Sequence, residues 1–249
     1  MAAKLYDEIG VGYSDYRRPD PRIAAAIHSA LGDAASVVNV GAGTGSYEPK
    51  GSGVVAVEPS SEMIRQRSSG SAPALQAEAA ALPFGDDTFD AALAVLTLHH
   101  WTDRLRGLAE LARVARERVV ILTFDPEACR CFWLVEDYFP LITEIDRTLV
   151  PTLAEYRQAL GALEIREIPV PHDCSDGFLG AYWRRPERYL DDGARRAISA
   201  FQKIDTEPGL QRLRADLDSG RWHENYGGLL ERDALDLGYR LLISAPRSG

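Results

Sequence analysis

Three glycines follow a short apolar segment near the start of the chain, and an acidic residue follows the next apolar segment. The glycines are Gly41, Gly43 and Gly45, and the acidic residue is Glu58. Side chains at the glycines would collide with a ligand lying over the end of the segment, and glycine also supplies the backbone angles of a sharp turn. A carboxylate at position 58 is placed to accept hydrogen bonds from both hydroxyls of a ribose. The pattern therefore predicts a site for a ligand that contains a ribose.

The spacing after the glycines argues against a dinucleotide. A dinucleotide site requires a glycine loop followed directly by a well-formed helix, because the helix N-terminus faces the pyrophosphate. Only residues 46–52 separate the loop from the next apolar segment. Glu48 places negative charge in the first possible turn, and Pro49 limits any helix to about one turn. A ligand without a pyrophosphate fits better, and an oxidoreductase that uses a nucleotide is the alternative.

Histidines are the candidates for acid–base chemistry. His99 and His100 follow the apolar segment 91–98, and His172 follows the segment 163–170. Imidazole is the side chain best poised for proton transfer near neutral pH, so all three are candidate catalytic residues. The alternative for the histidine pair is structural, with one ring capping the following helix and the other packing under a lid.

The segments that would position these residues alternate between strand and helix patterns. Short runs rich in Val, Leu and Ile are typical of parallel strands covered on both faces. Such runs occupy residues 36–40, 53–58, 74–77, 91–98, 118–123, 163–170 and 238–244, and helical patterns occupy residues 21–31, 61–66 and 101–115. The alternation predicts an α/β fold with a parallel sheet and helices on its faces. Ligands bind such sheets beyond the carboxyl ends of the strands.

Two long stretches, residues 125–162 and 171–234, do not fit the alternation. Both carry aromatic residues at helical spacings. We interpret them as helical additions that form a cap over the sheet, together with residues 1–20. At 249 residues, the chain is expected to form a single domain, residues 1–249, with this cap.

Composition narrows the class of partner and the compartment. Acidic residues outnumber basic ones by 37 to 28, which argues against a nucleic-acid partner. The first residues lack a signal peptide, and the longest apolar run is too short to span a membrane, so a cytoplasmic location is expected. The three cysteines suit a reducing compartment. Their spacing favours buried apolar roles over a three-thiolate site, so no metal is expected.

Three longer motifs carry a resemblance to a known family. They are VVNVGAGTG, VVAVEPSSEM and AEAAALPFGDDTFDAALAVLTLHHW, within residues 37–124. On these motifs the chain resembles the class I S-adenosylmethionine-dependent methyltransferases, particularly their bacterial small-molecule branch. Two features depart from the family pattern. Asn39 stands where the family usually has an acid, and the helix after the glycine loop is shorter than usual.

The resemblance implies a Rossmann-like, seven-stranded sheet of order 3-2-1-4-5-7-6 with the last strand antiparallel and helices on both faces. It also implies S-adenosyl-L-methionine as cofactor and S-adenosyl-L-homocysteine as product. The methyl acceptor would be a small molecule, methylated on oxygen or nitrogen before carbon or sulfur. A protein that keeps the cofactor pocket but serves as a non-catalytic partner is the alternative from another class.

The resemblance further implies a set of residues around the adenosine half of the cofactor. Glu58 would bind the ribose, and Pro59 and Met63 would lie against the adenine ring. Glu78 would accept a hydrogen bond from the adenine amino group, while the Ala79 N–H would donate to a ring nitrogen.

A second set would surround the methionine half. The loop formed by Gly41, Ala42, Gly43, Thr44 and Gly45 would pass under it, and backbone groups near Val95 and Leu96 would hold its amino group. Tyr13 and either Arg17 or Arg18 would reach its carboxylate.

Overall fold

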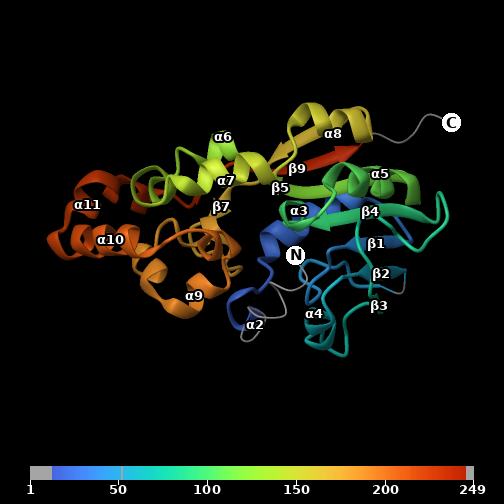
Figure 1. Cartoon of the computed structure of the whole chain (residues 1–249), viewed down its shortest axis with the longest axis horizontal. Helices are drawn as coiled ribbons and strands as arrows, with labels where there is room; N and C mark the ends of the chain where they lie inside the picture. The colour runs from blue at the N-terminus through green and yellow to red at the C-terminus, as the bar shows by residue number, and fades with distance from the viewer. Residues whose placement is uncertain (1–12, 52, 245–249) are drawn as a thin grey trace.

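The computed structural model describes residues 13–51 and 53–244, and its main feature is a seven-stranded sheet (Figure 1). The strand order is β3-β2-β1-β4-β5-β9-β6. β9 runs antiparallel to β5 and β6, and the other pairs are parallel. The predicted order and the antiparallel last strand are therefore confirmed. The bounds are β1 Val37–Val40, β2 Val54–Val57, β3 Ala74–Leu75, β4 Phe89–Val95, β5 Ala115–Phe124, β6 Leu163–Glu167 and β9 Tyr239–Ser244.

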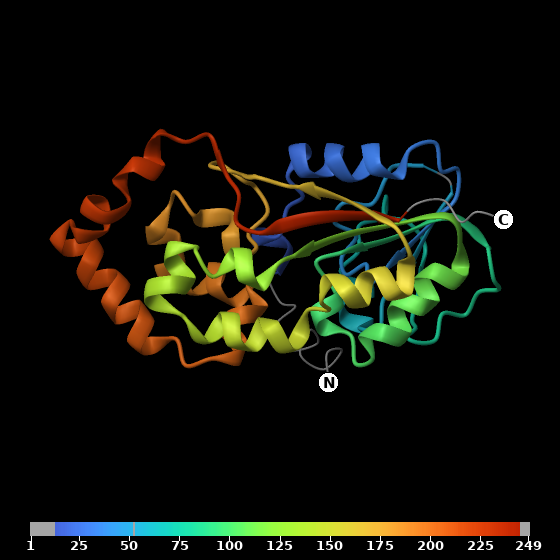
Figure 2. The same cartoon turned by 90° about the horizontal axis from the view of Figure 1, so that it is seen from above.

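Helices cover both faces of this sheet (Figure 2). On one face lies α3, Pro21–Leu31, which begins after the N-cap Asp20 and packs Ile23 and Ile27 on the core. On the other face lie α5, Arg104–Val114, and α8, Leu153–Leu160. A hydrophobic core lies on each face of the sheet, and alternate residues of a strand pack into one core or the other, because successive side chains of a strand point to opposite faces. β1 thus gives Val37 to one core and Val38 to the other.

Most of the remaining helical elements gather beside the sheet, at the end where β4 and β5 finish (Figures 1 and 2). Tryptophans 133, 183 and 222 are buried among them. These elements are α6 Pro126–Cys129, η2 Leu134–Tyr138, α7 Leu141–Leu149, η3 Leu179–Tyr182, η4 Pro186–Leu190, α9 Asp192–Arg196, η5 Ser199–Lys203, α10 Glu207–Ser219, α11 Arg221–Tyr226 and η6 Gly227–Glu231. We call this group the cap. The short elements α4 Ser61–Arg65 and η1 Leu98–His100 lie outside it. From the predicted cap segment 1–20, α2 Tyr13–Tyr16 contacts α9 of the cap, and residues 1–12 lie outside the described residues.

Besides an earlier end of the predicted strand 91–98, at Val95, the structure differs from the sequence prediction in three places. The predicted strand 163–170 is two strands, because Pro169 cannot donate to the ladder. β6 stays in the main sheet, whereas β7, Val170–Pro171, pairs with β8, Ala234–Leu235, in a separate ribbon. The predicted helix 101–115 begins only at Arg104, after the 3₁₀ turn η1.

The third difference concerns α8, which lies within the predicted cap segment 125–162. It packs against α5 on the sheet instead, where its Tyr156 is buried and donates a hydrogen bond to Thr123 Oγ1 at 3.2 Å. Amphipathic helices of cap and sheet carry the same apolar periodicity, so the sequence does not separate them. Within the described part of the chain, none of the helices has the length and apolar character to cross a membrane.

Candidate active site

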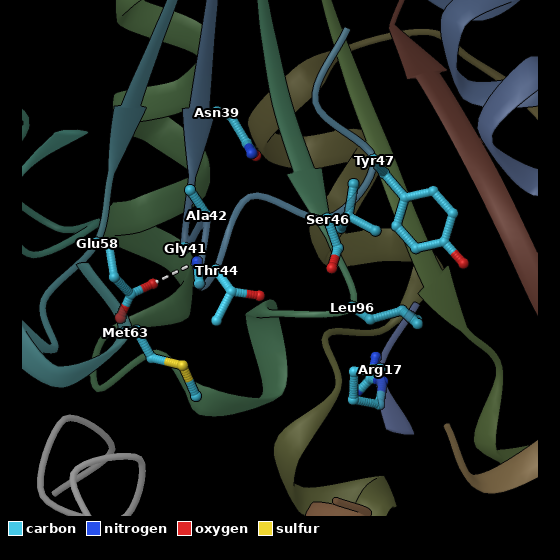
Figure 3. A pocket seen from close by; sticks show the side chains of 12 residues that line it. Arg17, Asn39, Gly41, Ala42, Thr44, Ser46, Tyr47, Glu58, Met63 and Leu96 are labelled. Atoms are coloured by element: carbon cyan, nitrogen blue, oxygen red, sulfur yellow. Dashed lines mark hydrogen bonds between the residues drawn. The ribbon is translucent and has the colours of Figure 1, made fainter. Parts of the chain in front are cut away.

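A cavity lies at the carboxyl ends of β1, β2 and β4 (Figure 3). Nine of the predicted cofactor-binding residues line it: Arg17, Gly41, Ala42, Gly43, Thr44, Glu58, Met63, Val95 and Leu96. The structure adds Asn39, Ser46 and Tyr47 to this lining. We call this space the first cavity.

The glycine loop forms its floor and is tied to the neighbouring strand. The N–H groups of Gly41 and Ala42 donate to Val57 O at 2.8 and 3.1 Å. Gly41 has a φ of 70°, and a Cβ there would lie 2.0 Å from Thr97 Oγ1. Gly43 has a φ of 51°, yet a Cβ there would meet no atom within 4 Å. Gly41 is therefore required by the protein's own packing, whereas Gly43 leaves space for a ligand.

Glu58 is buried and is held in place by two backbone N–H groups. Its Oε2 accepts from Gly43 N–H at 2.8 Å, and its Oε1 accepts from Ser60 N–H at 3.0 Å. Burial raises the pKa of Glu58 above its usual value, and these two hydrogen bonds oppose that rise. A carboxylate oxygen can accept more than one hydrogen bond, so each oxygen keeps acceptor capacity for a ligand hydroxyl.

Asn39 contributes an unsatisfied oxygen to the first cavity. Its Nδ2 donates to Glu48 Oε1 at 3.1 Å, and Glu48 pairs with Arg67 at 2.7 Å. The Oδ1 atom is buried and has no hydrogen-bond partner among the described residues. Because an unsatisfied buried acceptor is costly, this atom fits a site completed by a ligand's donor group. The ammonium group of S-adenosyl-L-methionine, the cofactor that the resemblance implies, is such a donor.

A network of charged and hydroxyl groups closes one side of the first cavity. Arg17 Nε donates to Asp176 Oδ1 at 2.5 Å, and Tyr47 Oη donates to Asp176 Oδ2 at 2.9 Å. Asp20 N–H donates to Tyr47 Oη at 3.2 Å. Asp176 is 1% exposed and lies far along the chain from its partners. The network therefore anchors the segment after β7 to the edge of the first cavity.

A second cavity shares Arg17 and Leu96 with the first. Leu96 has a φ of 49°, which is uncommon for a residue other than glycine, and its N–H donates to Leu122 O at 2.8 Å. Only its carbonyl is left for a ligand in the first cavity. The other residues of the second cavity are His99, His100, Phe124, Cys129, Asp146, Phe178, Leu179, Ile198, Ser199, Ala200, Lys203 and Tyr239.

The histidine pair predicted from the sequence lies in this second cavity. The rings of His99 and His100 have centroids 3.9 Å apart, and His99 meets Phe124 edge-on at 5.4 Å. Burial, reinforced by the positive charges of Lys203 and Arg17, lowers the pKa of His100 to about 3. Burial lowers the pKa of His99 as well. Both rings are therefore neutral near pH 7 and can donate and accept hydrogen bonds.

Other predicted residues line neither cavity. His172 lies on the β7–β8 ribbon with its Nδ1 3.2 Å from Asp233 O, so the structure separates it from the histidine pair. Pro59 is bound through its carbonyl to Gln76 Nε2 at 3.0 Å. Glu78 is exposed, although its charge contributes to the raised pKa of Glu58.

Two further predicted residues, Ala79 and Arg18, also line neither cavity. Ala79 is buried in the core beneath the sheet, and Arg18 is exposed. The side chain of Tyr13 lies outside the described part of the structure. Contacts of Pro59, Glu78, Ala79 and Tyr13 with a cofactor stay predictions.

Sequence reasoning missed Asp146 and Lys203, which the cap contributes to the second cavity. A partial signal was present. Asp146 lies three and four residues after Thr143 and Ile142, which are both buried, so it shares their face of α7. Lys203 is one of only three lysines in the sequence. Neither observation alone places the residue near the sheet.

The cysteines do not come together. Cys129 Sγ donates to Leu237 O at 2.8 Å, Cys174 Sγ donates to Asp176 O at 3.6 Å, and Cys131 is exposed. In residues 13–51 and 53–244, no group of three or more metal-ligating side chains is found.

Comparisons with known proteins agree with this geometry. The family model described as "Methyltransferase domain" matches residues 38–123. The crystal structure described as "Putative methyltransferase from antibiotic biosynthesis pathway", from Anabaena variabilis, is 33% identical, with 92% of this chain and 99% of that chain covered and a TM-score of 0.84. No curated protein sequence matches significantly.

More distant structures share the fold. An S-adenosylmethionine-dependent methyltransferase from Thermotoga maritima is 13% identical, covering 99% of this chain and 100% of its own, with a TM-score of 0.56. Geranyl diphosphate C-methyltransferase from Streptomyces coelicolor, solved with S-adenosyl-L-homocysteine, is 15% identical, covering 90% of this chain and 76% of its own, with a TM-score of 0.53. The oxidoreductase alternative is not supported. The chain belongs to the class I S-adenosylmethionine-dependent methyltransferases, and its cofactor is S-adenosyl-L-methionine.

Proposed function

We propose that this enzyme methylates an oxygen or nitrogen atom of a small molecule held in the second cavity, with carbon and sulfur as less favoured acceptors. One observation carries the proposal: the two cavities meet at Arg17 and Leu96. A cofactor in the first cavity would thus face an acceptor enclosed by the cap. The relative's assignment to an antibiotic biosynthesis pathway supports a small-molecule acceptor.

The residues of the first cavity fit the cofactor. Glu58 would accept hydrogen bonds from the ribose hydroxyls, because each of its oxygens has only one backbone donor. The buried Asn39 Oδ1 and the Leu96 carbonyl would accept from the ammonium group. Arg17 would attract the carboxylate, and Gly43 leaves room above the loop.

Bound S-adenosyl-L-methionine supplies a methyl group on a sulfonium, and transfer breaks the carbon–sulfur bond while its electron pair stays on sulfur. The protein must chiefly hold the acceptor atom in line with that bond, and such positioning supplies roughly 7–11 kcal/mol in well-oriented cases. His99 and His100 are suited to this task, because both rings line the second cavity. Their lowered pKa values favour hydrogen bonding to the acceptor over removal of its proton.

The composition argues against a nucleic-acid acceptor and for a cytoplasmic location. The net charge of −9 disfavours nucleic acid as a methyl acceptor. A cytoplasmic location is supported by the small number of cysteines.

Titration calorimetry with S-adenosyl-L-homocysteine tests the cofactor half of the proposal. We expect Glu58→Ala to weaken binding at least about tenfold, or roughly 1.4 kcal/mol, because the ribose loses its acceptor. Asp90→Asn is the matched control. Asp90 is also a buried carboxylate that accepts from backbone N–H groups, those of Ala35 and Ser36, but near the start of β4. Unchanged affinity in Glu58→Ala would show that the site is misplaced.

The acceptor half is tested by turnover. We expect release of S-adenosyl-L-homocysteine from S-adenosyl-L-methionine with some members of a panel of small hydroxyl and amine acceptors. Substitution His100→Phe should lower kcat by about tenfold or more, because orientation in the second cavity is lost. Turnover that is insensitive to His99→Phe and His100→Phe would contradict the assignment of the second cavity.

A further inference from the structure

Asp146 is a buried carboxylate in the wall of the second cavity. It lies in the last turn of α7, a helix that packs against η1, which carries His99 and His100. It is 6% exposed, and its side chain has no hydrogen bond or ion pair with any described residue. Its oxygens are open to the cavity and accept no hydrogen bond from a described residue, so they are available to a donor group of a ligand.

Lys203 faces the same cavity from η5 and carries the opposite charge. It is half-buried and likewise forms no ion pair or hydrogen bond within residues 13–51 and 53–244. The two groups feel each other's charge: burial raises the pKa of Asp146 to about 6, and Lys203 opposes that rise. Burial correspondingly lowers the pKa of Lys203. They are therefore neighbours in the cavity that do not neutralise each other by direct contact.

Among the described residues that line the second cavity, the other charged side chain is that of Arg17, which lies at the border with the first cavity. Arg17 is paired with Asp176, and the Cys129 thiol donates to Leu237 O. His99 and His100 are neutral. The remaining walls are largely apolar or aromatic, formed by Phe124, Phe178, Leu179, Ile198 and Tyr239. Most small-molecule sites have such apolar walls with a few polar groups that fix orientation.

We propose that the methyl acceptor is a zwitterion of the amino-acid type, whose ammonium group binds Asp146 and whose carboxylate binds Lys203 while an apolar or aromatic body packs on the remaining walls. This inference rests on the proposed function, because it takes the second cavity as the acceptor site. A single headgroup with both charges satisfies Asp146 and Lys203 together, which neither a neutral nor a singly charged headgroup does. The pair is thus a specificity-determining element, distinct from the histidines that orient the acceptor.

Four probes with one common ring separate the two charges: phenol, tyramine, 3-(4-hydroxyphenyl)propionate and tyrosine. Binding of each probe to the enzyme saturated with S-adenosyl-L-homocysteine is followed by ligand-observed NMR titration at pH 7.5. We expect tyrosine to bind about tenfold more tightly than phenol, because it gains two charge-assisted hydrogen bonds. Tyramine and the propionate should fall between them.

Two variants should split this preference. In Asp146→Asn, tyrosine should bind no better than the propionate, because the ammonium group has lost its partner. In Lys203→Met, tyrosine should bind no better than tyramine. The control variants Glu144→Gln and Arg196→Met remove one charge each from exposed positions on α7 and α9, and should keep the wild-type order.

Three outcomes would overturn the inference: equal binding of the four probes, no binding of any probe, or the wild-type order retained in both variants. The affinity for S-adenosyl-L-homocysteine, measured on the same samples, shows that each variant is folded. It also separates the two levels of the argument. If the wild-type enzyme does not bind S-adenosyl-L-homocysteine, the proposed function fails, whereas normal binding with no probe preference removes only the zwitterion.

Discussion

Two separate requirements favour glycine at position 43, its backbone conformation and the space that a ligand needs above it. Its φ of 51° favours glycine, and a Cβ there would point into open space within the first cavity. Gly161, at the end of α8, has a φ of 77° and equally open surroundings, but it lies away from both cavities. Substitutions at these two positions therefore distinguish the effect of backbone strain from the effect of blocking the ligand.

Gly43→Ala and Gly161→Ala should each destabilise the fold by about 1–3 kcal/mol, the cost of a side chain at a backbone conformation with positive φ. Only Gly43→Ala should weaken binding of S-adenosyl-L-homocysteine, by about tenfold, because its methyl group occupies cofactor space. Thermal unfolding and calorimetry on both variants check this. Equal affinities in the two variants would mean that the cofactor does not pass over Gly43.

Asp146 gives a prediction about stability and pH. Its pKa is raised from 3.8 to about 6 in the folded state, so the native protein holds a proton that the unfolded chain releases earlier. Wild-type stability should therefore fall as the pH rises from about 4 to 6, and stay lower above it. The groups that face Asp146 in the cavity are Arg17, His99, His100, Cys129, Lys203 and Tyr239.

Asp146→Asn should accordingly be more stable than wild type at pH 7.5, by up to about 3 kcal/mol, and equal to it near pH 4. Urea unfolding at a series of pH values measures the difference. A variant less stable than wild type at pH 7.5 would show that the carboxylate has a stabilising partner. The expected gain fits a residue retained for ligand binding at a cost in stability.

The sequence predicts site residues well where local geometry dictates them and poorly where tertiary structure does. Gly41, Gly43 and Glu58 follow strands directly, so their spacing alone places them at one edge of the sheet. Asp146 and Lys203 reach the second cavity through helices whose position depends on packing across the whole cap. His172 follows a strand as predicted, but that strand belongs to the ribbon and not to the main sheet.

At the scale of elements, one hydroxyl helps to join the segment after β7 to the cofactor site. Tyr47 lines the first cavity and donates to Asp176, which also binds Arg17. Tyr138 makes the same type of bond, to Asp216 at 2.9 Å, but within the cap. Matched Tyr→Phe substitutions can therefore distinguish a role in the site from a general contribution to stability.

Tyr47→Phe and Tyr138→Phe should each cost about 1 kcal/mol of stability, the usual contribution of one hydrogen bond. Tyr47→Phe alone should weaken binding of S-adenosyl-L-homocysteine, by roughly fivefold, because Asp176 and Arg17 lose part of their orientation. Denaturant unfolding and calorimetry measure the two effects. A similar loss of affinity in Tyr138→Phe would argue for a general loosening of the cap.

The elements themselves show where sequence patterns suffice. The inner strands β1 and β4 are buried on both faces, so their continuous apolar runs identify them. β7 and β8 have two residues each, too few for any period to appear. The sheet order was predicted from the resemblance to a family. The residues of a strand do not by themselves determine which distant strand pairs with it.

At the scale of the whole molecule, the cap and the sheet share one hydrophobic core. The cluster that includes Val37, Leu93 and Leu122 of the sheet also includes Trp133 and Trp222 of the cap. Shared burial of this kind couples the unfolding of two regions, because neither can open without exposing apolar surface of the other. The chain should therefore behave as the single domain expected from its length.

The distribution of tryptophans makes this testable. Trp101 lies on the opposite face of the sheet, whereas the other three, residues 133, 183 and 222, lie in the core shared with the cap. In the variant Trp101→Phe, fluorescence reports on that shared core alone, while far-ultraviolet circular dichroism reports on every helix and strand. We expect the two urea-unfolding curves to coincide, with one midpoint, and saturating S-adenosyl-L-homocysteine to raise both together. If fluorescence changes at a lower urea concentration than dichroism, the cap unfolds before the sheet, and the ligand should then stabilise the second transition more than the first.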